Sequence, residues 1–455
     1  MKKKTILSLV RSRLWQLGWI SILGIFALVV NVFAVSSYAQ DTEAQDKLAI
    51  TPSPSNSASS PSSGLGNDTF QDYYDQVYQI RVVSPKAGSK SSIGSGFQVS
   101  SDGLIVTNYH VISSFAQAPA NHKIEYQSHT GQKGDLELLD FDVINDLAIL
   151  RHSSPSSRFL GFSDTMLSKG ETVYALGNPR DYGTSLVKGP NNGMVEHSYN
   201  EQILFSGSLN PGMSGGPAVN ALGKVVGVNV ATAGSQLSFL VPANNAIQLV
   251  NAGRTIPQAD YQNEIARQIK QWQRPRIQQL LDNEWPAEQF AGLELFGEIR
   301  KDFQCWGQTN ESNKERDIAS VSKSCRAGNS LYLDASLTAG ELYFSFDQSS
   351  AVTLGELQFT SAIRPWMSAN NTSNYEHSSN YRCHVDFLQG RKNSQQFVRA
   401  TTCIRSFKKL VGLYDSLLMI ERIDGLRQFV THLSVSAIEA DQISLLNRKF
   451  IERSL

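Results

Sequence analysis

Short apolar runs alternate with glycine, asparagine and aspartate between residues 77 and 242 of the chain. Runs of this length with this punctuation are typical of strands in all-β barrels or sandwiches. We expect strands over residues 77–83, 94–99, 104–107, 123–127, 135–139, 147–151, 172–175, 185–187, 193–197, 202–205, 216–219, 225–229 and 238–242. Residues 188–193 read as a long connection between two of them, and 243–252 as a short closing helix. The pattern predicts a mainly β fold.

After the closing helix the apolar positions change to helical spacing. Ile265, Ile269 and Trp272 follow one another at i, i+4 and i+7, which predicts a helix over 260–284. Pro275 should break or kink this helix, because proline lacks the amide proton and its ring collides with the preceding turn. A stripe of this kind indicates packing against a domain, and a partner-binding helix is the alternative.

The last part of the chain combines strand-like runs with all four cysteines. Runs such as 330–335, 340–346 and 417–422 suggest an α+β domain. The cysteines form two pairs of equal separation, which are Cys305 with Cys325 and Cys383 with Cys403. In an exported chain these two local disulfides are the favoured one of three connectivities, and a zinc site without C-x-x-C spacing is the weaker alternative.

The N-terminal sequence indicates the cellular compartment of the protein. Lysines at positions 2–4 precede an apolar stretch over 17–35, and Ser-Tyr-Ala at 37–39 fits a small-x-small cleavage site. Residues 1–39 are therefore a cleaved signal peptide or an uncleaved membrane anchor, since the stretch is nearly long enough to span a bilayer. In both cases the bulk of the chain lies outside the cytoplasm, in the periplasm or the extracellular space. Residues 40–68 are rich in serine and proline, which predicts a flexible spacer.

The balance of charged residues indicates which classes of molecule the chain is not expected to bind. The chain has 41 Lys and Arg against 41 Asp and Glu, and no long basic patch interrupts this balance. We therefore expect no nucleic-acid partner. The histidines show no metal-ligand spacing such as H-x-x-x-H, so neither a metal nor another cofactor is expected.

The strongest candidate for chemistry is the stretch Gly212-Met213-Ser214-Gly215-Gly216-Pro217. Its glycines let the backbone fold tightly around Ser214 and present the hydroxyl on an exposed turn. They also leave the amides of Gly212 and Ser214 free to point at one spot, where an oxyanion could develop. A plain Gly/Ser/Pro turn is the alternative, so the interpretation depends on a base and an orienting acid elsewhere in the chain.

Both partners occur upstream of Ser214. His110 follows a strand-like run, at a position that we expect to be a loop on the rim of a barrel. Histidine is the side chain that accepts a proton near neutral pH without large tuning of its pKa. Asp140, Asp142 and Asp146 all lie close to the start of an apolar run, and the residues alone do not choose among them.

Together these segments resemble a chymotrypsin-fold, trypsin-like serine peptidase, and most closely the HtrA-type (DegP-like) proteases. The resemblance rests on Gly-Ser-Gly-Phe at 94–97, the histidine segment 102–112, the aspartate segment 142–150, Gly-Asn-Pro at 177–179, the serine segment 210–219 and the glycine-containing strand 223–229. It covers residues 75 to 250, with the motifs in the family's order. The resemblance implies two six-stranded antiparallel β-barrels with the site in the cleft between them, and it selects Asp146.

The resemblance also assigns a role to each residue of the site. His110 would take the proton of the Ser214 hydroxyl, Asp146 would orient the imidazole, and the amides of Gly212 and Ser214 would form the oxyanion hole. The substrate pocket would be lined by Ser208, Leu209, Asn229, Val230 and Ala231. The segments that supply them carry no carboxylate, so we expect a small or medium apolar side chain at P1, the substrate residue that supplies the scissile carbonyl.

The expected organisation has three parts after the spacer. Residues 69–253 form the peptidase domain, 254–290 a helical linker, and 291–455 a cysteine-containing domain of unknown family in place of the usual PDZ domains. Phe70, Tyr73 and Tyr74 lie where HtrA-type enzymes commonly trimerise, so a homo-oligomer and ordinary core packing both stay open.

Two functions remain after these steps. The first is an exported serine endopeptidase that cleaves unfolded or damaged envelope polypeptides through an acyl-enzyme. The second is a catalytically silent binding protein on a peptidase fold, whose C-terminal domain recruits partners. Labelling by a fluorophosphonate probe separates the two.

Overall fold

The computed structural model describes residues 73–179, 182–234, 236–363, 376–389 and 397–454 of the chain. The predicted signal peptide or anchor, the predicted spacer and Phe70 lie outside the described residues. None of the described helices is long and apolar enough to cross a membrane.

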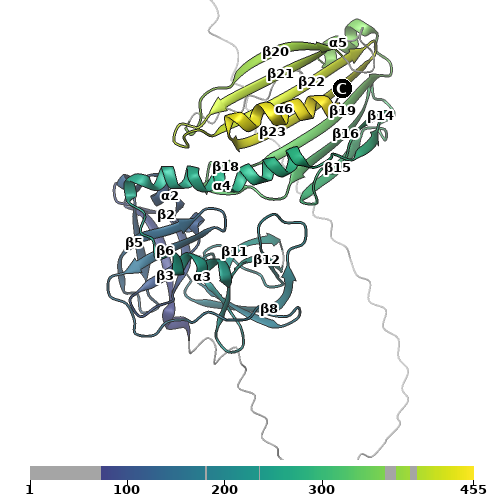
Figure 1. Cartoon of the computed structure of the whole chain (residues 1–455). Coiled ribbons are helices and arrows are strands. Elements are labelled where there is room, and N and C mark those ends of the chain that lie inside the picture. Colours follow the sequence, from purple (N-terminus) through teal and green to yellow (C-terminus); the bar gives the residue numbers. More distant parts are fainter. Residues whose placement is uncertain (1–72, 180–181, 235, 364–375, 390–396, 455) are drawn as a thin grey trace, which may run out of the picture. The chain divides into compact units, whose positions relative to one another are not determined.

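The first barrel is a closed antiparallel sheet with the strand order β1-β2-β3-β6-β5-β4. Figure 1 labels its strands β2, β3, β5 and β6. Its strands are β1 (Val77–Ser84), β2 (Ser89–Gln98), β3 (Leu104–Thr107), β4 (Lys123–Gln127), β5 (Lys133–Asp142) and β6 (Leu147–His152). Successive side chains of a strand point to opposite faces, so in β4 Ile124 and Tyr126 fill the barrel while Lys123 is exposed. Helix α2 (Tyr109–Gln117) follows β3 directly.

The second barrel is also closed and antiparallel, with the order β10-β11-β12-β9-β8-β7. Its elements are β7 (Thr172–Gly177), β8 (Ser185–Met194), β9 (Ile203–Phe205), β10 (Pro217–Val219), β11 (Val225–Gly234), β12 (Leu237–Pro242) and the closing helix α3 (Ala243–Ala252). Short 3-10 turns are η1 (Tyr74–Gln76), η2 (Pro119–Asn121) and η4 (Gln258–Asp260). The predicted mainly β fold with two six-stranded barrels is confirmed.

One local prediction in this barrel was wrong. Residues 188–193 were expected to be a connection, because glycine, proline and asparagine favour turns. They instead belong to β8, where Lys188 pairs with Tyr174 and Pro190 with Thr172 of β7. Pairing along the whole length of β7 outweighs the local turn preference.

The C-terminal part is built on a seven-stranded antiparallel sheet in the order β15-β16-β19-β23-β22-β21-β20. Its strands are β15 (Phe303–Thr309), β16 (Ile318–Ala327), β19 (Leu342–Ala351), β20 (Arg382–Gln389), β21 (Phe397–Ser406), β22 (Tyr414–Asp424) and β23 (Arg427–Ile438). Two hairpins accompany it, β13 (Ala287–Phe290) with β14 (Leu293–Phe296) and β17 (Leu331–Asp334) with β18 (Leu337–Ala339). Helix α5 (Glu356–Ile363) follows β19.

Helix α6 (Ala440–Ser454) covers one face of this sheet (Figure 1). Its buried side chains Ile443, Leu446 and Phe450 recur at helical spacing and join one apolar cluster with Phe344 and Leu418 of the sheet. The sheet therefore has a core of its own.

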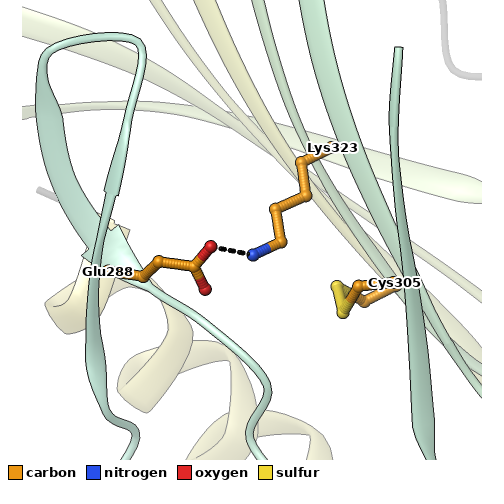
Figure 2. Close-up of a disulfide and its surroundings, with 4 residues drawn as sticks. Glu288, Cys305 and Lys323 are labelled. Carbon is orange, nitrogen blue, oxygen red and sulfur yellow. Dashed lines mark hydrogen bonds and ion pairs between the residues drawn. A yellow bond between two sulfur atoms is a disulfide. The ribbon is translucent and has the colours of Figure 1, made fainter.

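A disulfide joins each of the two edge strands of the sheet to the neighbouring strand. Cys305 of β15 lies directly opposite Cys325 of β16, and Cys383 of β20 lies opposite Cys403 of β21. Each pair is bonded, so each edge strand is covalently tied to the neighbour with which it pairs. Figure 2 shows the Cys305 disulfide near the ion pair between Glu288 of β13 and Lys323 of β16.

Helix α4 (Tyr261–Asp282) links the two cores. Ile265 and Ile269 in its first half belong to the apolar cluster of the first barrel, whereas Ile277 and Leu280 belong to the cluster of the seven-stranded sheet. Pro275 neither ends nor interrupts the helix, because packing on both sides outweighs the lost hydrogen bond. The predicted stripe is thus buried within this chain.

Candidate active site

The loop that carries Ser214 precedes β10 and is shaped by its glycines. Gly215 has φ +84°, and a Cβ at this position would collide with the carbonyl oxygen of Ser95. The buried Asn229 of β11 holds the loop in place. Its side-chain amide donates to the Met213 carbonyl at 3.3 Å, and its backbone carbonyl accepts the Gly215 N–H at 2.8 Å. Glycine is therefore required at position 215, where a larger residue does not fit.

Ser95 of β2 fastens this loop of the second barrel to the first barrel. The Ser95 amide donates to the Ser214 carbonyl at 2.7 Å, and its hydroxyl donates to the Gly212 carbonyl at 2.7 Å. The same hydroxyl accepts the Asn178 N–H at 2.8 Å, so it both donates and accepts a hydrogen bond inside a buried site. The relative position of the two barrels at Ser214 is therefore set by Ser95.

His110 and Asp146 form a close pair on the first barrel. The His110 ring donates from Nδ1 to Oδ2 of Asp146 at 2.6 Å, and the His110 backbone amide donates to Oδ1 at 2.8 Å. Both side chains are partly buried. The carboxylate thus holds the proton on Nδ1, which leaves Nε2 free to accept another.

The backbone around this pair is held in an uncommon conformation. Asp146 has φ +55°, in the left-handed region that residues other than glycine rarely adopt. The Asn108 side chain donates to the Asp146 carbonyl at 2.8 Å, and Gln268 of α4 binds the Phe141 carbonyl and the Val143 amide, both at 2.8 Å. Helix α4 therefore supports the segment that presents Asp146.

His110 does not lie on a loop, as we expected, but in the first turn of α2. Val111 and Ile112, which follow it, are fully buried in the core of the first barrel. Their burial stabilises a helix that the local sequence does not predict. Asn108 stands at the N-cap, but its side chain donates to the Asp146 carbonyl and does not cap the helix.

The other two carboxylates of this region have different partners. Asp140 is almost fully buried and binds the Arg254 guanidinium through both oxygens, at 2.8 and 2.9 Å. Asp142 accepts the amides of Ile144 and Asn145 and so caps its own turn. Of the three candidates, Asp146 is the one that the structure places against His110.

Two effects of opposite sign act on the pKa of His110. Burial of the ring lowers the pKa, whereas the charge of Asp146 and its hydrogen bond raise it. The two contributions from Asp146 together prevail, so the pKa of His110 lies above its ordinary value of 6.5.

The Ser214 hydroxyl is not bonded to His110. It donates to the Val230 carbonyl at 2.7 Å. Within the described part of the chain, nothing accepts a hydrogen bond from the amide of Gly212 or of Ser214. The hydroxyl must leave the Val230 carbonyl before His110 can take its proton, while both amides are already available to an incoming oxygen.

The five predicted pocket residues occupy different environments. Ser208 is exposed, Leu209 belongs to the core of the second barrel, and Asn229 is fully buried beneath the serine loop. Val230 lines a cavity beside Asp146. Ala231 continues β11, and its side chain lies outside what the structure describes. The role of these residues in a substrate pocket stays a prediction.

Several residues that shape the site were not singled out from the sequence. Ser95, Asn108 and Asn178 lie inside the motifs that carry the resemblance, so attention to their buried hydrogen-bonding groups could have found them. Gln268 of α4 and Tyr332 of β17 come from outside those motifs, and no local pattern indicates them. Among the described residues, no cluster of three or more His, Cys, Asp and Glu could hold a metal ion.

Part of the chain is similar in sequence to known serine peptidases. Residues 94–228 match the trypsin-like peptidase domain. A probable periplasmic serine endoprotease, DegP-like, from Chlamydia pneumoniae is 31% identical over 209 residues, which cover 44% of this chain and 41% of that protein. A relative of the same description from Marinomonas sp. is 32% identical over 205 residues, covering 42% of each chain. The crystal structure of a serine endoprotease from Yersinia pestis aligns with a TM-score of 0.37 and 24% identity, over 42% of this chain and 68% of that one.

The chain therefore contains a trypsin-like serine peptidase domain. Within that class, its relatives are the DegP-like (HtrA-type) serine endoproteases. The match spans about two-fifths of the length of those curated relatives.

Proposed function

We propose that this protein is a serine endopeptidase that hydrolyses peptide bonds with Ser214, His110 and Asp146. The observation that carries the proposal is the double hydrogen bond between His110 and Asp146, beside a loop with a serine and two unbonded amides. The similarity of residues 94–228 to trypsin-like peptidase domains supports the same reaction.

The proposed reaction proceeds in two halves. Nε2 of His110 takes the proton of the Ser214 hydroxyl as Oγ attacks the scissile carbonyl, and the amides of Gly212 and Ser214 bind the resulting oxyanion. His110 then gives this proton to the leaving amine, which leaves an ester on Ser214. Water repeats the steps on the ester, releases the carboxylic acid and restores the hydroxyl. Asp146 keeps the imidazole oriented and stabilises its protonated form.

The proposed substrates are unfolded or damaged polypeptides with a small or medium apolar side chain at P1. The predicted pocket segments around Ser208 and Val230 carry no carboxylate that could pair with lysine or arginine. Dominant cleavage after lysine or arginine in an unfolded protein would contradict this specificity.

The proposed location is the periplasm or another exported compartment. The DegP-like relatives are described as periplasmic, and two disulfides suit an oxidising environment. Anchoring through residues 17–35 and self-association remain part of the proposal. Tyr73 packs against the second barrel and Tyr74 stacks edge-on with His129, so both contact their own chain.

A fluorophosphonate probe tests the proposed function. The chain without its first 40 residues should react with the probe, and digestion followed by mass spectrometry should find the adduct on Ser214. The second candidate, a silent binding protein, is favoured by one observation, the hydrogen bond of the Ser214 hydroxyl to Val230 instead of His110. Absence of labelling, with or without denatured protein or heat, would favour the silent protein.

The pH dependence of cleavage should report His110. Because only the neutral imidazole accepts a proton, kcat/KM should be lost as the pH falls through a pKa above 6.5. Asp146→Asn removes the negative charge beside His110 but leaves the ring buried. The inflection of the pH profile should therefore move below pH 6.5, and kcat should fall by about 10⁴-fold. The matched control is Asp135→Asn at an exposed position of β5, which should leave the profile unchanged. An inflection that stays in place in Asp146→Asn would argue against this assignment.

A further inference from the structure

The hairpin β17–β18, which belongs to the C-terminal part, lies against the catalytic pair of the peptidase domain. The ring of Tyr332 is 6.0 Å from the ring of His110, centroid to centroid, with the planes 79° apart. The Tyr109 hydroxyl, next to His110 in α2, donates to the Leu333 carbonyl at 3.3 Å. An element from outside the peptidase domain therefore borders the site.

The strand alternation of β17 directs Tyr332 towards the site. Leu331 and Leu333 are buried in the apolar cluster of the first barrel, whereas Tyr332 between them is 40% exposed. Neighbouring side chains of a strand point to opposite faces, so anchoring the two leucines turns the tyrosine outward beside His110. Its position is thus fixed by packing on both sides.

A cavity of about 150 Å³ opens between Tyr332 and the two barrels. Asp146 and Val230 both line it. The Val230 carbonyl is the acceptor of the Ser214 hydroxyl, so the cavity adjoins two members of the proposed triad. Its third side is the segment between β8 and β9 that contains Asn200.

Two of the asparagines that line this cavity already have partners. Asn200 accepts the Trp272 indole N–H at 2.8 Å and donates to the Ile144 carbonyl at 3.1 Å. Asn329 accepts the Tyr199 amide at 2.7 Å. No lysine or arginine lines the cavity. The lining includes hydrocarbon from Ile144, Val230, Leu331 and the Tyr332 ring, which suits an apolar guest. It also includes the carboxylates of Asp146 and Glu201, which disfavour an anionic guest.

The walls of the cavity are held by a buried arginine. The guanidinium of Arg276 in α4 lies 3.7 Å from the Trp272 ring centroid and 5.0 Å from that of Tyr199. It also donates to the Asn329 carbonyl at 3.3 Å. One side chain thus clamps the Asn200 wall and the hairpin wall together, which pre-organises the cavity for binding.

Strand β11 supplies a path for the substrate backbone. Its pairing with β10 ends at Val228, and from Val230 to Gly234 it pairs with β12 alone among the described strands. An extended peptide can add to this free edge. Its successive side chains then point to opposite sides, so a P1 side chain in the second barrel sends the next one towards His110 and Tyr332.

We propose that this cavity binds the side chain of the P2 residue, which precedes P1, and that Tyr332 makes it selective for a medium apolar side chain such as leucine. The inference rests on the proposed peptidase function. It gives the C-terminal part a direct role in choosing the cleavage site.

The test compares fluorogenic peptides that share P1 and differ at P2, with leucine, glycine or aspartate. The unaltered enzyme should prefer leucine to glycine by about 10-fold or more in kcat/KM, and should reject aspartate. Tyr332→Ala should reduce the leucine preference about 10-fold, and Tyr332→Phe should retain it. The matched control is Phe387→Ala, which removes an exposed aromatic ring on β20 of the seven-stranded sheet and should change nothing.

Probe labelling of Ser214 in each variant separates the two proposals. Normal labelling with an unchanged P2 preference in Tyr332→Ala would overturn the role of Tyr332 and leave the peptidase function standing. Absence of labelling and cleavage in the unaltered protein would overturn both. If Tyr332→Ala fails to fold, Tyr332→Trp decides the matter, because the larger ring should shift the P2 preference from leucine towards glycine.

Discussion

Replacing Ser214 with alanine is expected to lower kcat for peptide hydrolysis by about 10⁶-fold, because no other group can form the acyl-enzyme. Stability should barely change. The lost hydroxyl makes one hydrogen bond, to the Val230 carbonyl, at a partly buried position, which corresponds to about 0.5–1.5 kcal/mol. The measurements are the cleavage rate of a fluorogenic peptide and the thermal unfolding midpoint.

The matched control is Ser89→Ala, at an exposed position of β2, the strand that also carries Ser95. It should keep the full rate. Adding His110→Ala to Ser214→Ala should cost almost nothing more, since the two residues act as one unit. Cleavage at the normal rate by Ser214→Ala would remove Ser214 from the mechanism and return the serine loop to an ordinary turn.

A chain that ends at Gly253 is expected not to fold, although its last residue closes the predicted peptidase domain. Tyr261, Ile265, Ile269 and Trp272 of α4 are buried in the same cluster as the first barrel. Burial of such side chains contributes about 1.5–3 kcal/mol each. The four together approach the 5–15 kcal/mol that is typical of a whole domain.

The comparison is between residues 73–253 and residues 73–455. The longer chain should melt cooperatively and react with the fluorophosphonate probe, and the shorter one should do neither. Ile269→Ala in the longer chain provides a graded version, with an expected loss of about 2–5 kcal/mol in the free energy of unfolding. A shorter chain that melts cooperatively and is labelled would show that α4 is dispensable.

Local patterns predicted most of the barrels correctly because each strand has its own alternation and its own turn residues. They failed where a distant partner decides the outcome. Residues 188–193 have the composition of a loop, yet they belong to β8, and residues 188–190 pair with β7. Pro275 was expected to break or kink a helix that instead continues through it, packed against two cores. His110 was expected in a loop, and the burial of its neighbours draws it into a helix.

Some residues of the candidate site could likewise be predicted from local sequence, and others could not. Ser214 and its glycines are a local signal, and the resemblance selected Asp146, which the structure places against His110. Tyr332 could not be found, because β17 reaches α2 from a distance of 224 positions in the chain, as the contact from Tyr109 to Leu333 shows. Periodicity and spacing describe neighbours in sequence, and they carry no information on a contact of this range.

The two disulfides have a consequence for how the seven-stranded sheet assembles. Each joins residues that face each other directly, Cys305 with Cys325 and Cys383 with Cys403. Sliding an edge strand by one residue would turn its side chains to the wrong face, and sliding it by two would part the cysteines. Each disulfide can therefore form only when its edge strand is paired in the native register, and once formed it fixes that register.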